Sequence, residues 1–144
     1  MLKPFNKLKW AEIEVSKMYL FTALYVFVRS SYFIFNKEDA FHESAFYVTL
    51  DKFIPLPVVG IIILVFGLTY LLGSFNIPSQ QHNRNCNMII FVGSIIGFVV
   101  YFIMASASFF TAINYISTFQ FLVFSTWFFT NALTSWGELY DRRK

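Results

Sequence analysis

Four long apolar runs, separated by short polar or charged segments, dominate the chain. They cover residues 17–35, 54–75, 88–110 and 117–136. A bilayer core of about 30 Å needs about 20 mostly apolar residues per helix, and each run has roughly that length. The pattern predicts an all-α, polytopic membrane protein in which four transmembrane helices form a compact bundle. We expect residues 1–144 to make a single membrane domain.

The segments between and before these runs have patterns of their own. Residues 37–53 carry apolar side chains at helical spacing and acidic ones at their start, which predicts a short amphipathic outer helix between the first and second transmembrane helices. Residues 4–16 mix aromatic, aliphatic and charged side chains, which favours either a helix on the inner headgroups or a plain leader. Residues 79–87 are polar without an apolar period, so we expect a cytoplasmic connector there. The second run is opened by prolines, which suit a helix start, and the fourth ends at Gly137, which suits a helix stop.

Composition supports the membrane interpretation. The chain is 57% hydrophobic and 22% aromatic but only 13% charged, whereas soluble domains carry about 25% charged residues. The core of a soluble protein of this size could not hold all of these aromatic side chains. Lipid must therefore solvate most of them. The single cysteine, Cys86, cannot form an internal disulfide.

The basic residues predict the orientation through the positive-inside rule, which counts lysines and arginines in short loops. With both termini in the cytoplasm, only Lys37 and Lys52 lie outside. The bases then inside are Lys3, Lys7, Lys9, Lys17, Arg84, Arg142, Arg143 and Lys144. We therefore expect a multi-pass protein of the cell (inner) membrane with both termini cytoplasmic. An alternative topology makes the first run a surface helix, with three crossings and termini on opposite sides.

Arg29 is the one charge well inside an apolar run, and intramembrane charges are rare and often functional. The first run contains enough apolar residues for insertion to remain favourable, but only marginally. We expect the guanidinium to snorkel outward or to pair with an outer carboxylate. The candidates are Glu38, Asp39, Glu43 and Asp51. A transport or ligand role is the less favoured alternative.

Small residues mark a candidate packing face. Gly93 and Gly97 form a GxxxG pair in the third run, and Gly60 and Gly67 lie seven apart, on one face of the second. Small residues let helix backbones approach closely, so we expect the two glycine faces to pack together inside the protein. Self-association through the GxxxG pair is the alternative.

The fourth run carries a polar stripe formed by Ser117, Gln120, Asn131 and Thr134. Amide side chains facing lipid would be costly, so the stripe should face the bundle or a pore. Hydrogen bonding between helices is the simpler interpretation. The other runs hold few polar residues, which argues against a permanent channel within one protomer.

No motif predicts chemistry or a cofactor. His82 and Cys86 share a loop without the further ligands that a structural zinc site needs. His42 beside Glu43 could imitate an acid–base pair of a lipid-modifying enzyme, but no nucleophile with an adjacent base accompanies it. The net charge of +3 is too small and too divided for a nucleic-acid site. We therefore expect no catalytic, cofactor-binding or metal-binding residues.

These patterns favour a non-enzymatic, small inner-membrane protein of bacterial or phage type. It would act by lateral helix–helix association with another membrane protein, in an accessory, assembly or immunity role. In its organisation, four short-looped helices with both termini inside, the chain is similar to the immunity proteins against pore-forming colicins; that similarity involves no diagnostic residues. The alternative function is a holin-like or channel-forming homo-oligomer that brings the fourth-helix stripes of several copies together. An interfacial enzyme is a third possibility.

Overall fold

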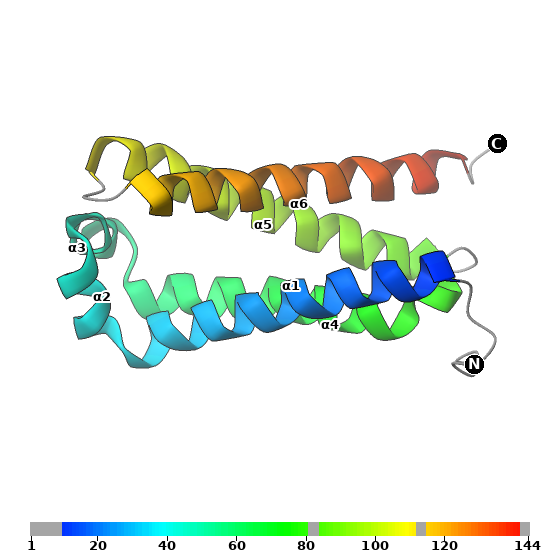
Figure 1. Ribbon diagram of the computed structural model, residues 1–144, viewed down its shortest axis with the longest axis horizontal. Helices are drawn as coiled ribbons and strands as arrows, with labels where there is room; N and C mark the ends of the chain where they lie inside the picture. Colours follow the sequence, from blue (N-terminus) through cyan, green and yellow to red (C-terminus); the bar gives the residue numbers. More distant parts are fainter. Residues whose placement is uncertain (1–9, 81–83, 112–114, 142–144) are drawn as a thin grey trace.

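The computed structural model describes residues 10–80, 84–111 and 115–141. Over these residues every secondary-structure element is a helix, which confirms the predicted all-α class. Four long helices run side by side in alternating directions, and two short helices lie across one end of the molecule (Figure 1). The elements are α1 (Trp10–Phe35), α2 (Lys37–Glu43), α3 (Ala45–Phe53), α4 (Leu56–Gln80), α5 (Arg84–Thr111) and α6 (Tyr115–Asp141).

Three helices are long and apolar enough to cross a membrane. The candidate spans are Ile13–Phe35 in α1, Leu56–Asn76 in α4 and Asn87–Phe109 in α5. Helix α6 contains the predicted fourth run and has 27 residues, but it is not among these candidates. Its serine, threonine, glutamine and asparagine side chains make it less apolar than α4 and α5.

Two helix boundaries differ from those predicted from the sequence. The predicted single outer helix is divided at Ser44, whose backbone is extended (φ −158°, ψ 130°) and whose hydroxyl accepts a hydrogen bond from the Phe46 N–H. A side chain that caps the next helix makes that break favourable. Helix α6 does not stop at Gly137 but continues to Asp141. Residues 10–16 belong to α1, whereas the rest of the predicted inner-surface helix lies outside the described residues, as does the centre of the 79–87 connector.

The start of α4 is fixed by a carboxylate rather than by its prolines alone. The Leu56 N–H donates a 2.7 Å hydrogen bond to Asp51 Oδ1. The first turn of a helix leaves backbone N–H groups without partners inside the helix, and an acidic side chain satisfies one of them. Asp51 lies in α3, so this bond also ties α3 to the start of α4.

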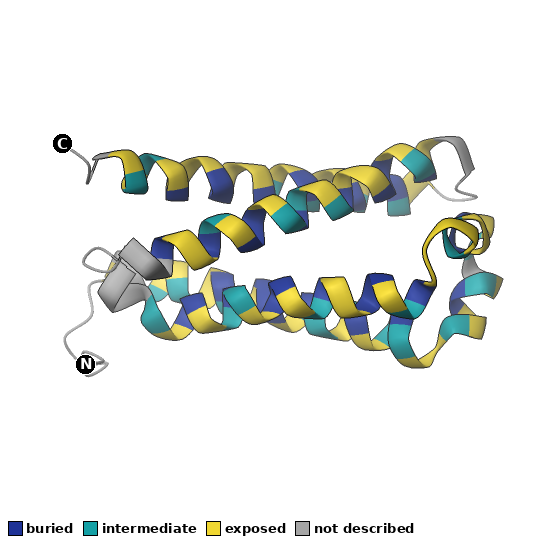
Figure 2. Cartoon of the chain, turned by 180° about the vertical axis from the view of Figure 1, so that it is seen from behind, coloured by how far each residue is buried: buried dark blue, intermediate teal, exposed yellow. Residues whose placement is uncertain are grey.

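The long helices form two tight hairpins, α1 with α4 and α5 with α6, and α4 and α5 join the hairpins. Buried positions face neighbouring helices, and exposed positions face outward along every long helix (Figure 2). The outward positions are largely Val, Leu, Ile and Phe. Apolar residues facing outward along the whole length of the helices are typical of a membrane-type fold.

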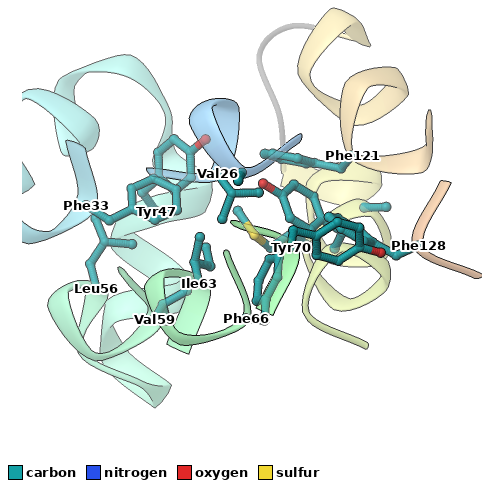
Figure 3. Close-up of a cluster of buried hydrophobic side chains, with 14 of the residues drawn as sticks. Val26, Phe33, Tyr47, Leu56, Val59, Ile63, Phe66, Tyr70, Phe121 and Phe128 are labelled. Atoms are coloured by element: carbon teal, nitrogen blue, oxygen red, sulfur yellow. The ribbon is translucent and has the colours of Figure 1, made fainter. Parts of the chain in front are cut away.

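Aromatic rings fill the centre, where the hairpins meet. Phe66 and Tyr70 of α4 contact Phe128 of α6 edge-on, with ring centroids 5.3 and 5.4 Å apart (Figure 3). Tyr101 of α5 lies 5.4 Å from the same Phe128 ring. Edge-to-face and offset contacts at such distances are the favourable arrangements for aromatic pairs. Aromatic side chains therefore fill the space between α4, α5 and α6 at the centre of the bundle.

Candidate functional site

Helices α1 and α6 meet through long side chains and make no close backbone approach comparable to that within the hairpins. We call this contact the α1–α6 seam and define it by Tyr25 and Arg29 of α1 and Gln120, Phe121 and Phe124 of α6. Phe121 is buried, whereas the other four are half-buried. The seam therefore combines polar groups with partial exposure, unlike the apolar outward faces of the bundle.

Two side chains of α6 hold Tyr25 in place. Gln120 Nε2 donates a 2.6 Å hydrogen bond to Tyr25 Oη. The Tyr25 ring is stacked on Phe124, with centroids 4.2 Å apart and an interplanar angle of 9°. Gln120 and Phe124 lie one helical turn apart on the same face of α6. Gln120 therefore reaches the hydroxyl of Tyr25 while Phe124 reaches its ring.

Arg29 lies in a cage of aromatic rings contributed by three helices. Its Cζ is 4.9 Å from the centroid of Phe33 in α1, 5.6 Å from that of Tyr47 in α3 and 5.5 Å from that of Phe121 in α6. Nη2 also donates a hydrogen bond to Tyr47 Oη. Aromatic faces attract a cation, and the attraction increases where water is excluded. The cage holds the guanidinium but supplies no negative charge.

Among the described side chains, Arg29 pairs with none of the predicted outer carboxylates; the side chain of Glu43, the fourth candidate, lies outside the described set. Among the described side chains, the ion pairs are Lys17 with Glu14 and Lys37 with Asp51, each at 2.8 Å. Asp51 is already engaged by Lys37 and by the Leu56 N–H, and Glu38 and Asp39 are exposed. The Leu56 N–H and Lys37 together hold the pKa of Asp51 below its ordinary value.

Further hydrogen-bond donors lie behind and beside the seam. The Tyr101 hydroxyl is fully buried without a hydrogen-bond partner, and the Tyr101 ring lies 5.4 Å from that of Phe124. Arg29 Nε and Trp127 Nε1 are likewise buried without hydrogen-bond partners. Buried polar atoms are normally hydrogen-bonded, so donors left without a partner mark places where a further acceptor would be favourable.

The predicted polar stripe of the fourth run divides into different environments. Gln120 crosses the seam, Ser117 is half-buried and Asn131 is buried inside the bundle, as expected. Thr134 is exposed instead, and its hydroxyl donates to the Asn131 carbonyl of its own helix at 3.0 Å. A threonine can satisfy its hydroxyl on the preceding turn, so it does not need to face the bundle.

The small polar side chains through which α6 packs on the rest of the bundle were not predicted from the sequence. Thr118, Ser125 and Ser135 are buried, and Ser108 of α5 donates a 3.0 Å hydrogen bond to Thr118. The signal that could have found this face is the run of small residues seven apart, Thr118, Ser125 and Ala132. That stripe marks the side of α6 that packs inside the bundle.

The predicted contact between the two glycine pairs is also wrong. Gly60 and Gly67 face α1, where an added Cβ would lie 3.0 Å from the Ser30 carbonyl oxygen and 2.7 Å from Val26 Cγ1, respectively. Gly93 faces Thr69 of α4, and at Gly97 a Cβ would lie 2.9 Å from the Phe128 ring of α6. All four glycines are buried against this chain's own helices, which favours internal packing over self-association through the GxxxG pair.

Among the described residues, no group of three or more His, Cys, Asp or Glu side chains could hold a metal ion. His42 is exposed on α2, and the side chains of Glu43, His82 and Cys86 are outside the described set. Comparison with known protein families, with curated proteins and with solved structures found no match to this chain. The candidate site therefore rests on geometry alone.

Proposed function

We propose that this chain is a non-enzymatic, small inner-membrane protein of bacterial or phage type that acts by lateral association with another membrane protein. The role would be that of an accessory, assembly or immunity factor. The observation that carries the proposal is the α1–α6 seam, a half-buried polar contact that contains Arg29 without a carboxylate partner. A partner helix lying along the seam would cover polar groups that lipid solvates poorly.

We further propose that α6 is a fourth span and that both termini are cytoplasmic. At about 1.5 Å of rise per residue, the 27 residues of α6 extend about 40 Å, enough to cross a bilayer. Its outward residues include Phe119, Val123 and Leu133, which suit lipid. The start of α1 and the end of α6 lie at one end of the molecule (Figure 1).

Reporter fusions test this topology. A reporter fused after Lys144 should be cytoplasmic, and one inserted near Glu43 should be external. An external carboxyl terminus would contradict the four-span topology.

Other polar groups on the outward surface of α6 do not call for a partner. Thr126 donates to the Leu122 carbonyl at 3.0 Å and Thr130 to the Trp127 carbonyl at 2.8 Å. Hydroxyls satisfied by their own helix can face lipid at little cost. This contrast supports the seam, rather than the outer face of α6, as the association surface.

The alternative, a holin-like or channel-forming homo-oligomer, has less support from the geometry. It requires the polar stripes of several α6 helices to meet, yet Asn131 is buried within its own bundle and Thr134 is satisfied by its own helix. Copies joined at their seams would also bring Arg29 side chains together, and like charges in a low-dielectric medium repel strongly.

Crosslinking from defined positions tests the proposal. A photoreactive residue would replace Val28 or Val123, which precede Arg29 and Phe124 and are 72% and 66% exposed. The matched control is Val65, exposed on α4 away from the seam. We expect adducts with another membrane protein from Val28 and Val123 but not from Val65. Adducts at twice the mass of this chain would favour the homo-oligomer, and no adduct from either seam position would contradict lateral association there.

A further inference from the structure

The positive charge of Arg29 is not matched by an acid in the part of the chain that the structure describes. Arg29 belongs to no ion pair among the described side chains, and none of the four apolar runs contains an acidic residue. The acids of the chain are Glu12, Glu14, Glu38, Asp39, Glu43, Asp51, Glu138 and Asp141. Ionisable residues within a membrane usually pair with one another or with backbone carbonyls, and unpaired ones are costly. No acid among the described side chains of this chain supplies the missing charge.

We propose that the partner presents an Asp or Glu side chain, carried on a membrane helix, to Arg29 at the α1–α6 seam. This inference rests on the proposed lateral association and specifies its chemistry. A carboxylate accepts hydrogen bonds through two oxygens, and a guanidinium presents its donors in a matching fork. In a medium that excludes water, the attraction between the guanidinium and the carboxylate is large. Arg29 should therefore prefer an acidic side chain to a neutral one.

The donors around Arg29 fit such an acceptor. Nη2 is used by Tyr47, whereas Nε is buried without a hydrogen-bond partner. The hydroxyl of Tyr101, a fully buried residue of α5, is a further donor without a hydrogen-bond partner. Arg29 is itself half-buried and lies beside the exposed Val28. In the proposed complex the carboxylate meets the part of the Arg29 side chain that is exposed, and the buried Nε becomes its partner as the side chains adjust.

A lipid phosphate is the less suitable anion because aromatic side chains cover the other route to Arg29. Helix α3 lies at the end of the molecule where a headgroup would approach (Figure 1), and its residues Phe46 and Tyr47 are 2% and 4% exposed. Their rings contact Phe121 and Phe33, respectively, with centroids 6.3 and 5.3 Å apart. Helix α3 thus closes the guanidinium off from that end, and the seam remains the open side.

A second copy of this chain is also the wrong partner. Its apolar runs contain no carboxylate to offer, and its own Arg29 would approach with the same charge. Like charges juxtaposed at an interface disfavour a wrong partner. The unpaired arginine therefore selects for a different protein and against self-association at this surface.

The test uses the full chain in phosphatidylcholine vesicles with synthetic helices as probes. Each probe is a Leu–Ala helix of about 20 residues. One probe carries a single Glu about six residues from its outer end, the depth of Arg29 relative to the end of α1 at Phe35. The matched probe carries Gln at the same place. Association is measured by energy transfer between a dye on the probe and a dye on the protein, at a pH above neutrality.

We expect the Glu probe to bind about tenfold more tightly than the Gln probe, because charge-assisted hydrogen bonds are roughly twice as strong as neutral ones. The preference should disappear in Arg29→Gln and should shrink in Arg29→Lys, which keeps the charge but loses the fork. The comparison of the two probes on the unchanged protein does not depend on whether an Arg29 variant folds. Equal binding of the two probes, or binding of neither, would overturn the acidic partner.

The source of the anion is checked by changing the vesicle. In equal parts of phosphatidylcholine and phosphatidylglycerol, the preference for Glu should persist, because α3 covers the headgroup side of Arg29. Loss of the preference would show that lipid phosphates neutralise Arg29 and would overturn the inference. The crosslinking from Val28 and Val123 decides lateral association separately, so the two proposals fail on different results.

Discussion

Helix α1 forms two interfaces of different kinds, one with α4 and one with α6. Against α4 it packs on Gly60 and Gly67, and the Ser30 hydroxyl donates a 2.9 Å hydrogen bond to the Gly60 carbonyl. Against α6 it packs through the stacked Tyr25 and Phe124 rings and through Arg29. The first interface joins backbones across small residues, and the second joins the ends of long side chains.

The difference follows from the physics of packing in lipid. Apolar burial gives no driving force between helices when the solvent is itself apolar, so close contact and hydrogen bonds must hold them together. Small residues provide close contact along a whole helix, which makes the α1–α4 hairpin a fixed unit. Long aromatic and polar side chains at the seam hold fewer atoms at close range and stay half-exposed. The seam is therefore the interface that a partner can extend.

The largest effect should come from adding bulk at the small-residue interface. Gly60→Leu places its Cβ 3.0 Å from the Ser30 carbonyl, a backbone atom that cannot rotate away. We expect a loss of about 3 kcal/mol in unfolding free energy, at the upper end of overpacking costs, because the α1–α4 backbones must separate. Thermal unfolding in detergent measures it. Gly137→Leu is the matched control, since nothing lies within 4 Å of a Cβ there; equal losses in both variants would contradict close packing as the cause.

Removing a ring from the seam should cost less. Phe124→Ala deletes the 4.2 Å stack on Tyr25 and the 5.4 Å contact with Tyr101. Fully buried Phe→Ala changes cost about 3–5 kcal/mol, but Phe124 is half-buried and lipid tails can fill the space. We expect a loss of about 1 kcal/mol, within the range of aromatic pair energies. Val123→Ala, one residue away and exposed, should leave the melting temperature unchanged, and a loss at Phe124 as large as at Gly60 would remove the distinction between the interfaces.

Single hydrogen bonds allow a finer comparison of the same two interfaces. Ser30→Ala removes a fully buried bond to Gly60, and we expect a loss of about 0.6 kcal/mol, the usual value between membrane helices. Gln120→Leu removes the 2.6 Å bond to Tyr25 at the half-exposed seam. Its loss should be smaller still, because leucine is favourable in lipid where an amide is not. Chemical unfolding of both variants under identical conditions gives the order, and a larger loss at Gln120 would reverse it.

The sequence predicted the helical class and placed the four long runs within helices, because apolar length is a property of the sequence alone. It did not predict which faces meet. Gly60 and Gly93 were expected to pack together, yet one faces α1 and the other Thr69. Periodicity shows that small residues share a face but does not identify the neighbour, which depends on the order and rotation of all helices in the bundle.

The same limit applies to Arg29. Its position within an apolar run marked it as a candidate site, but the cage around it comes from Phe33, Tyr47 and Phe121, which are distant in sequence except for Phe33. The outer acids lie close to it in the sequence and were therefore its predicted partners. Asp51 instead caps α4 and binds Lys37. Which group an acid meets depends on how α2, α3 and α4 are arranged, and sequence spacing does not show that arrangement.

The smallest effect should appear at the end of the seam that α3 covers, where acid should loosen α3 but leave the α1–α4 hairpin intact. The hydrogen bond from the Leu56 N–H and the contact with Lys37 lower the pKa of Asp51 from its ordinary value of 3.8. A carboxylate with a lowered pKa stabilises the fold fully at higher pH, and this contribution decreases as the pH falls below the ordinary value. Hydrogen exchange, corrected for the intrinsic rate at each pH, should therefore speed up in residues 45–53 below pH 3.8 more than in α4. Asp51→Asn cannot titrate, so its α3 should exchange faster already at neutral pH and show no further step in acid. An acid step of equal size in that variant would assign the loosening to other carboxylates.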